Sequence, residues 1–196
     1  MSEPLKKFLQ ISLWVAMIAF AIRCIVSWKS LNAAQTNEAW ASLSYSLLGY
    51  AGEAAVVTAL VMAVFEKWAW KWKPLNAITG GMPVLASCYS GSIISAYDHV
   101  KRDAQLLIKQ SYLNISIVLK TKESSSSSVA ATFLNLNEDP ELIYQYRNEP
   151  RADLTSESPM HYGTAILKVR NPDFISGNYY TSRKTVGTME FSKENT

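Results

Sequence analysis

Hydrophobic and polar residues follow different patterns in the two parts of the chain. Residues 8–28 and 43–65 are two apolar runs with few polar members. At about 1.5 Å per residue, each run crosses the roughly 30 Å hydrocarbon core of a bilayer as a helix. The first run is longer than the roughly 7–15-residue core of a signal peptide and lacks a small-x-small cleavage site. We therefore expect residues 1–73 to form a transmembrane hairpin.

After Pro74, apolar and polar residues alternate as they do in β-strands. The expected strands are about residues 84–97, 104–110, 112–121, 127–136, 141–148, 161–169, 174–183 and 185–193. Turn sequences separate several of them, at residues 137–140, 171–173 and 176–178. The serine run 124–128 predicts a flexible hairpin connection. The pattern predicts a membrane protein whose all-β domain, residues 74–196, is an antiparallel sandwich or an up-and-down barrel. Eight strands suffice for a minimal, lipocalin-like barrel around one small ligand.

The basic residues predict the orientation of the hairpin. They flank the two apolar runs, at Lys6, Lys7, Lys67, Lys71 and Lys73. The segment between the runs, residues 29–42, has one lysine, which Glu38 balances. The positive-inside rule then places both termini and the β domain in the cytoplasm, and the connecting segment outside. All six tryptophans lie in residues 1–73, several of them at the ends of the runs, where they suit interfacial anchoring.

Composition argues against several classes of function. The formal net charge of +3 is too small to indicate a DNA or RNA partner. The two cysteines, Cys24 and Cys88, do not make a disulfide framework, and two histidines leave no Cys/His cluster for a metal. There is no convincing catalytic triad, carboxylate pair or phosphate loop. We expect no catalytic residues, no metal and no cofactor.

Two features of the hairpin suggest more than an anchor. Small residues recur every four positions in the second run, at Ala51, Ala55, Ala59 and Ala63. Such a seam lets helix backbones approach closely, either within one chain or between chains. Arg23 and Glu53 are charges within the apolar runs, and they are costly in hydrocarbon unless they are paired, hydrated or near an interface. Either they form a structural ion pair, or Arg23 extends outward and leaves Glu53 on a polar face of an assembly.

Alternation also assigns polar side chains of the β domain to common faces. Tyr144, Tyr146 and Asn148 share one face of their strand, and Tyr179, Thr181 and Arg183 share another. Tyrosine offers a flat surface for a base, and arginine offers a bidentate fork for a phosphate. On the pattern alone, the simpler interpretation is that these residues form the solvated outside of the domain.

Three strings make the β domain resemble a known family. They are Tyr-x-Tyr-x-Asn-x-Pro from Tyr144, His-x-Gly-Thr from His161, and Gly-x-Tyr-x-Thr-x-Arg from Gly177. With two helices in front, the chain resembles the SMODS-associated two-transmembrane, β-strand-rich effectors of CBASS, a bacterial cyclic-oligonucleotide anti-phage system. The resemblance implies a ligand face of Tyr144, Tyr146, Asn148, His161, Tyr179, Thr181 and Arg183, with Tyr146 and Arg183 foremost. Gly163, Gly177 and Gly187 are expected to permit close backbone approach.

The resemblance also implies a function. The ligand is a cyclic dinucleotide made by a cognate nucleotidyltransferase, and its binding promotes self-association of the chain. The helices, with Arg23, Glu53 and the alanine seam, then disrupt the bacterial inner membrane and kill the infected cell. The alternative is a membrane-tethered, lipocalin-like protein for a small apolar ligand. An apolar interior would support that alternative, and Arg183 with the polar tyrosine face weighs against it.

Overall fold

The computed structural model describes residues 3–29, 40–134, 139–156 and 158–194. The chain divides into two compact units, Met1–Leu75 and Asn76–Thr196, and each is described by itself. Most of the segment expected to lie outside the membrane, residues 30–39, is outside the described residues.

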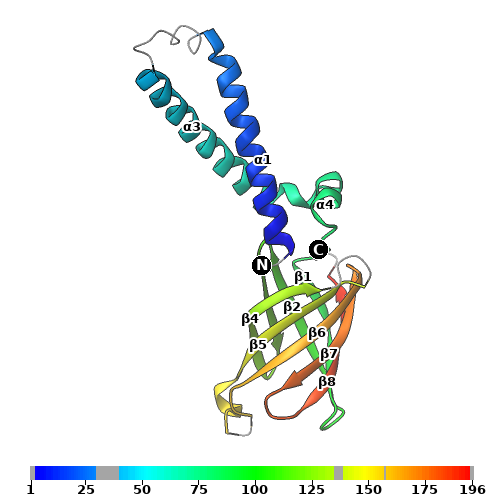
Figure 1. Cartoon of the computed structure of the whole chain (residues 1–196). Helices are drawn as coiled ribbons and strands as arrows, with labels where there is room; N and C mark the ends of the chain where they lie inside the picture. The colour runs from blue at the N-terminus through cyan, green and yellow to red at the C-terminus, as the bar shows by residue number, and fades with distance from the viewer. Residues whose placement is uncertain (1–2, 30–39, 135–138, 157, 195–196) are drawn as a thin grey trace. The chain divides into compact units, whose positions relative to one another are not determined.

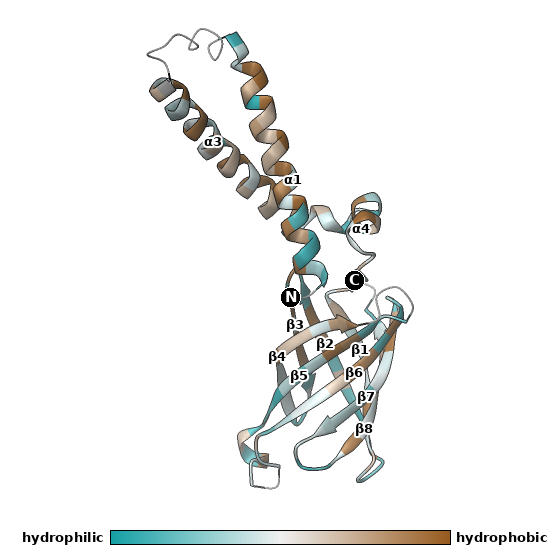
Figure 2. Ribbon diagram, viewed as in Figure 1, coloured by the Kyte–Doolittle hydropathy of each residue, from teal (hydrophilic) through white to brown (hydrophobic). Residues whose placement is uncertain are grey.

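The first unit is a helical hairpin (Figure 1). It contains α1 (Glu3–Val26), α3 (Trp40–Lys67) and the 3-10 turn η1 (Ala69–Lys71), and α4 (Lys73–Thr79) leads on from it. Both long helices are apolar enough to cross a membrane (Figure 2). α1 begins before its expected run and ends two residues short of the end of that run, whereas α3 extends beyond its run at both ends. They pack through few side chains, since Ala54, Met62 and Phe65 are buried on α3 while most apolar residues remain exposed. Exposed apolar side chains all round a helix are what a lipid environment requires.

The charged residues of the hairpin form an ion pair. Nε of Arg23 donates to Oε2 of Glu53 at 2.5 Å, and the guanidinium also contacts Ser27 Oγ. The guanidinium carbon lies 4.4 Å from the ring centroid of Tyr50, a cation–π contact. Of the two alternatives for these charges, the structure shows the pair.

The residues of the alanine seam are exposed in the hairpin. Ala51, Ala55, Ala59 and Ala63 are all exposed on α3, whereas Ala54, Met62 and Phe65 of the same helix are buried. This exposure leaves the seam open to contact with another chain.

The second unit is a closed antiparallel barrel in which each strand pairs with its neighbours in sequence and β8 pairs with β1. The strands are β1 (Cys88–Ser95), β2 (Lys101–Gln110), β3 (Ile115–Thr121), β4 (Ser124–Leu134), β5 (Glu141–Pro150), β6 (His161–Asn171), β7 (Phe174–Thr181) and β8 (Val186–Lys193). The predicted fold class, two N-terminal helices followed by an eight-stranded up-and-down barrel, is confirmed. Closure means that each of the eight described strands pairs with a neighbour on both sides, although β3 and β4 pair only through Val118–Lys120 and Ser125–Ser127.

Two expected breaks between strands are wrong. The serine run is the first part of β4, and the turn before it consists of Lys122 and Glu123. Its hydroxyls are used in the sheet, because Ser126 Oγ donates to Asn148 Oδ1 at 2.8 Å and Ser128 Oγ accepts from the Ile117 amide at 2.9 Å. The expected turn at residues 176–178 is inside β7. The Asn137–Pro140 turn lies partly outside the described residues.

Gly177 explains why a turn-like sequence sits within β7. A Cβ at this position would lie 1.9 Å from the backbone oxygen of Ile166, so only glycine lets the neighbouring strand approach this closely. The close-approach role expected of Gly177 is confirmed.

Only part of the barrel interior is packed with apolar side chains. These residues lie toward the end that holds the β2–β3, β4–β5 and β6–β7 connections, and the largest fully buried ones include Tyr89, Leu106, Ile117, Leu142, Leu167, Ile175 and Phe191. The hydroxyl of Tyr89 donates to the backbone oxygen of Pro172 at 2.6 Å, which closes this end. The other end of the interior contains polar side chains and a cavity.

Candidate ligand-binding site

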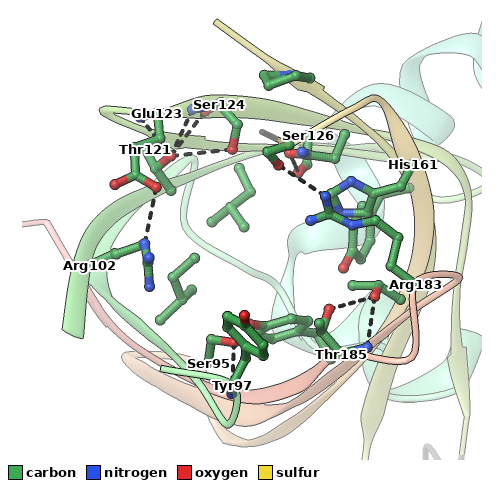
Figure 3. Close-up of a pocket in the computed structure, with 18 of the residues that line it drawn as sticks. Ser95, Tyr97, Arg102, Thr121, Glu123, Ser124, Ser126, His161, Arg183 and Thr185 are labelled. Carbon is green, nitrogen blue, oxygen red and sulfur yellow. Dashed lines mark hydrogen bonds and ion pairs between the residues drawn. The ribbon is translucent and has the colours of Figure 1, made fainter. Parts of the chain in front are cut away.

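A cavity of about 660 Å³ occupies the end of the barrel where odd-numbered strands connect to the following even-numbered ones (Figure 3). This volume is in the range of small-molecule sites. Its polar lining comes from Ser95, Tyr97, Asp98, Arg102, Thr121, Glu123, Ser124, Ser126, Tyr146, Asn148, Ser158, His161, Tyr179, Thr181, Arg183 and Thr185. A lining of this kind suits a polar ligand rather than an apolar one.

The alternation of β5 places its tyrosine face inside the barrel. Tyr144, Tyr146 and Asn148 are buried, whereas Gln145 and Arg147 are exposed. The simpler interpretation, that the tyrosine face is the solvated outside, is wrong for this strand. Closure of the barrel explains this burial, because it turns one face of each strand toward the interior.

Two tyrosine rings form the floor of the cavity, and each rests on a glycine. A Cβ at Gly163 would lie 2.4 Å from Cζ of Tyr146, and a Cβ at Gly187 would lie 2.4 Å from Cε1 of Tyr179. The close-approach role expected of these glycines is confirmed. Burial raises the pKa of Tyr146, so its hydroxyl stays protonated at neutral pH and remains a hydrogen-bond donor. The floor thus offers flat aromatic surface with polar ends.

One wall of the cavity is basic. Nη1 of Arg183, in the β7–β8 turn, donates to the neutral Ser158 Oγ at 3.2 Å, and no carboxylate among the described residues pairs with this arginine. His161, at the start of β6, lies beside it and donates from Nδ1 to the Pro159 oxygen at 3.1 Å (Figure 3). Burial lowers the pKa of His161, and the charge of Arg183 lowers it further. An anionic group placed here gains a guanidinium fork from Arg183, and it gains a second donor from Nε2 of His161 when that ring is protonated.

The facing wall carries an ion-pair cluster that the sequence pattern does not reveal. Nη2 of Arg102 donates to Asp98 Oδ2 at 2.6 Å, and its Nε donates to Glu123 Oε2 at 3.0 Å. The guanidinium holds the pKa of Asp98 at about 2, well below its usual value. The three residues come from β2 and from two turns, so their juxtaposition depends on barrel closure. The only local sequence signal of this cluster is the spacing of four positions between Asp98 and Arg102. This spacing does not predict an ion pair here, because a turn lies between the two residues.

Comparison with known proteins places the barrel in a family. Residues 82–193 match the family described as Cap15, cyclic dinucleotide receptor domain, which covers more than half of the chain. The chain belongs to this family. It is also similar to CD-NTase-associated protein 15 of Staphylococcus schleiferi, with 24% identity over 195 residues that span 98% of this chain and 99% of that protein. The resemblance to CBASS-associated receptors with two N-terminal helices is thereby confirmed.

The receptor domain includes every residue that lines the cavity, from Ile93 to Met189. Of the seven residues expected on the ligand face, six lie in the lining: Tyr146, Asn148, His161, Tyr179, Thr181 and Arg183. Thr181 is oriented by its neighbour, because its hydroxyl oxygen is 2.6 Å from that of Thr185. The lining residues that the sequence did not suggest are mainly hydroxyl groups and the Arg102 cluster.

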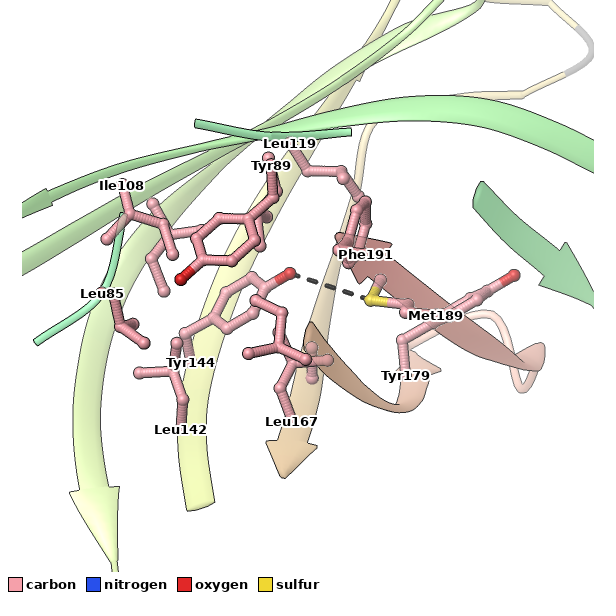
Figure 4. Packing of buried hydrophobic residues seen from close by; sticks show 14 of the residues in the cluster. Leu85, Tyr89, Ile108, Leu119, Leu142, Tyr144, Leu167, Tyr179, Met189 and Phe191 are labelled. Atoms are coloured by element: carbon pink, nitrogen blue, oxygen red, sulfur yellow. Dashed lines mark hydrogen bonds between the residues drawn. The ribbon is translucent and has the colours of Figure 1, made fainter. Parts of the chain in front are cut away.

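Tyr144 is the exception among the seven. It lies one layer below the floor, fully buried, with its ring centroid 5.8 Å from that of Tyr146 and its hydroxyl 3.9 Å from Met189 Sδ (Figure 4). The same alternation that points Tyr146 inward also points Tyr144 inward, but toward the packed end. Its position supports the floor of the cavity from below.

Within the part of the receptor domain and hairpin that the structure describes, no three His, Cys, Asp or Glu side chains are placed to hold a metal ion.

Proposed function

We propose that the barrel cavity binds the cyclic dinucleotide for which the domain is a receptor. The observation that carries this proposal is the pairing of a basic wall with an aromatic floor. A cyclic dinucleotide combines two phosphodiester anions with two flat bases. Arg183 and His161 suit a phosphate, and Tyr146 and Tyr179 suit a base. Asn148 and Thr181 add polar groups that fix the orientation of the ligand.

The second part of the proposal concerns the helices. A cognate nucleotidyltransferase supplies the cyclic dinucleotide in the cytoplasm, and binding promotes self-association of the chain. The associated helices then disrupt the bacterial inner membrane, which kills the infected cell. Two observations support this step: α1 and α3 are each long and apolar enough to span a bilayer, and the alanine seam of α3 is exposed. Two helices are too few to enclose a pore, so disruption requires several copies.

The binding step is tested with the full chain in detergent micelles. We expect calorimetric titration with a panel of cyclic dinucleotides to reveal at least one that binds. The linear dinucleotide of the same bases should bind more weakly, because its ends are not held in the cyclic shape. Failure of the whole panel to bind would refute the proposal. Saturable binding of a fatty-acid probe in its place would favour the lipocalin-like alternative.

The membrane step is tested with liposomes that contain a trapped dye. We expect the binding cyclic dinucleotide to trigger dye release from liposomes that carry the full chain, and the steepness of the protein dependence to exceed first order. Release that is independent of the nucleotide would contradict ligand control. Binding without any release would contradict the membrane step alone.

A further inference from the structure

The fixed charges of the cavity lining cancel one another. Among the described lining residues, Arg102 and Arg183 are the arginines, and Asp98 and Glu123 are the carboxylates. The other titratable group of the basic wall, His161, has a lowered pKa and is largely neutral at pH 7. A ligand with two phosphates brings two negative charges into a site whose own formal charge is zero. Burial of such a ligand is costly unless each phosphate meets a cation.

The two arginines differ in their availability. Arg183 has a neutral serine as its described side-chain partner. Arg102 has all three guanidinium nitrogens engaged: Nη1 and Nη2 face Asp98 at 3.2 and 2.6 Å, and Nε faces Glu123 at 3.0 Å. Among the described residues, Arg183 therefore has no carboxylate partner, whereas Arg102 is occupied by two carboxylates.

The two arginines lie on facing walls of the cavity, just as the two phosphates of a cyclic dinucleotide lie on opposite sides of its ring. Arg102 is on β2, and Arg183 lies beside His161 at the start of β6. In the eight-stranded ring, β2 and β6 are four strands apart in either direction, so they form facing walls. Figure 3 shows Arg102 and Arg183 across the cavity from each other.

The two carboxylates that hold Arg102 are not equivalent. Asp98 receives two guanidinium bonds, accepts from the Val100 amide at 3.1 Å, and has a side chain that is 30% exposed. Glu123 receives a single bond and has a side chain that is 55% exposed. The backbone of Glu123 is fixed, since its carbonyl accepts from the Arg151 amide at 2.9 Å. Release of Glu123 therefore needs only a side-chain rotation into solvent.

We infer that Glu123 is a removable counter-ion that competes with the second phosphate of the ligand for Arg102. This inference rests on the proposed binding of a cyclic dinucleotide in the cavity. Asp98 keeps its hydrogen bonds to Arg102 and orients the guanidinium. Nε of Arg102 exchanges its acceptor, from the Glu123 carboxylate to a phosphate oxygen of the ligand. The ion pair thereby lowers the affinity of the resting receptor, because only the fraction of molecules with a released Glu123 is competent to bind. Glu123 sets the ligand concentration at which the receptor responds.

The test is calorimetric titration of the full chain in detergent with the cyclic dinucleotide that binds the wild type. Glu123→Gln keeps the shape of the side chain and removes its charge, and we expect it to tighten binding by about 2- to 5-fold, the range of a partly exposed ion pair. Arg102→Gln should weaken binding by at least about tenfold, because it removes a charged hydrogen-bond donor. In the double variant, the gain from Glu123→Gln should disappear.

The matched control is Glu149→Gln. Glu149 also pairs with an arginine, Arg147, but on the exposed face of β5 and outside the cavity lining. It makes the same change in net charge, and we expect its affinity to equal that of the wild type.

Four results would overturn the inference. These are unchanged or weaker binding by Glu123→Gln, an equal gain from the Glu149 control, unchanged binding by Arg102→Gln, and persistence of the gain in the Arg102→Gln background. Weaker binding by Glu123→Gln would show that this carboxylate accepts a hydrogen bond from the ligand. If the wild type binds no cyclic dinucleotide, the proposed function itself fails, and that result is distinct from all four.

Discussion

Gly163→Ala is expected to push the ring of Tyr146 from the floor into the cavity. The new Cβ would lie 2.4 Å from both Cζ and Oη of Tyr146 and 2.7 Å from the backbone oxygen of Tyr180, whereas ordinary contacts begin near 3.4 Å. The ring of Tyr146 must therefore shift by about 1 Å. It is only 4% exposed and has Tyr144 packed below it, so the space open to it is the cavity. The same substitution thus strains the barrel and obstructs the site.

Overpacking of this kind costs about 1–3 kcal/mol. For a unit of this size, each kcal/mol lowers Tm by about 3–6 °C. Tm is measured on the full chain in detergent by circular dichroism of the β-sheet signal. Tryptophan fluorescence does not report on the barrel, because all six tryptophans lie in residues 1–73. We also expect the affinity for the cyclic dinucleotide to fall by at least about tenfold, because the displaced ring of Tyr146 takes up space in the cavity.

A double-mutant cycle with Tyr146→Leu tests the reasoning. Leucine lacks the outer ring atoms that meet the new methyl group, so Gly163→Ala should cost at least about 0.5 kcal/mol less in the Tyr146→Leu background. Equal costs in both backgrounds would show that Gly163 does not seat this ring. A wild-type affinity in Gly163→Ala would refute the assignment of the floor to the ligand site.

Three further predictions concern other parts of the molecule. Arg183→Ala should weaken binding of the cyclic dinucleotide by at least about tenfold without changing the cooperativity of unfolding, and an unchanged affinity would exclude this residue from the site. Affinity should rise as pH falls, because a bound phosphate raises the low pKa of His161 in the free barrel. The gain is at most tenfold per pH unit between the two pKa values, and His161→Asn should abolish it. Ala59→Leu should reduce ligand-triggered dye release without weakening binding of the ligand. Val56→Leu, at an exposed position of the same helix, should leave both dye release and binding unchanged. Normal dye release in Ala59→Leu would remove the seam from the mechanism.

Much of the fold is predictable from sequence because each part depends on local patterns. The apolar runs predict α1 and α3, although both helices continue into polar residues, because helical hydrogen bonding does not end where hydrophobicity does. Alternation predicts all eight strands to within a few residues. The serine run is mispredicted because its composition resembles a linker. Its hydroxyls find partners in Asn148 and in the Ile117 amide, and both partners come from neighbouring strands.

Only part of the site is predictable from sequence, because only some of its residues belong to local patterns. Tyr146, Asn148 and Arg183 stand in recognisable strings, and period two assigns them to faces. Which face lies inside is decided by barrel closure, and sequence alternation is the same for either choice. The Arg102 cluster joins residues from a strand and two turns, so no short local pattern in the sequence reveals it. The burial of Tyr144 below the floor of the cavity also cannot be predicted, because it depends on how far along the barrel axis the apolar packing extends.

The construction of the barrel bears on how a bound ligand acts. The cavity opens at the end opposite Cys88, where β1 begins, and the interior between is filled by buried residues such as Tyr144, Leu167 and Phe191. A closed sheet over a packed core is a stiff element. We therefore expect the effect of a bound ligand to be greatest at the mouth of the cavity, in the turns that carry Asp98, Glu123 and Arg183. We expect these turns, rather than the strands, to differ between the free and bound barrel, and this places the ligand-dependent contacts of the proposed assembly at the mouth.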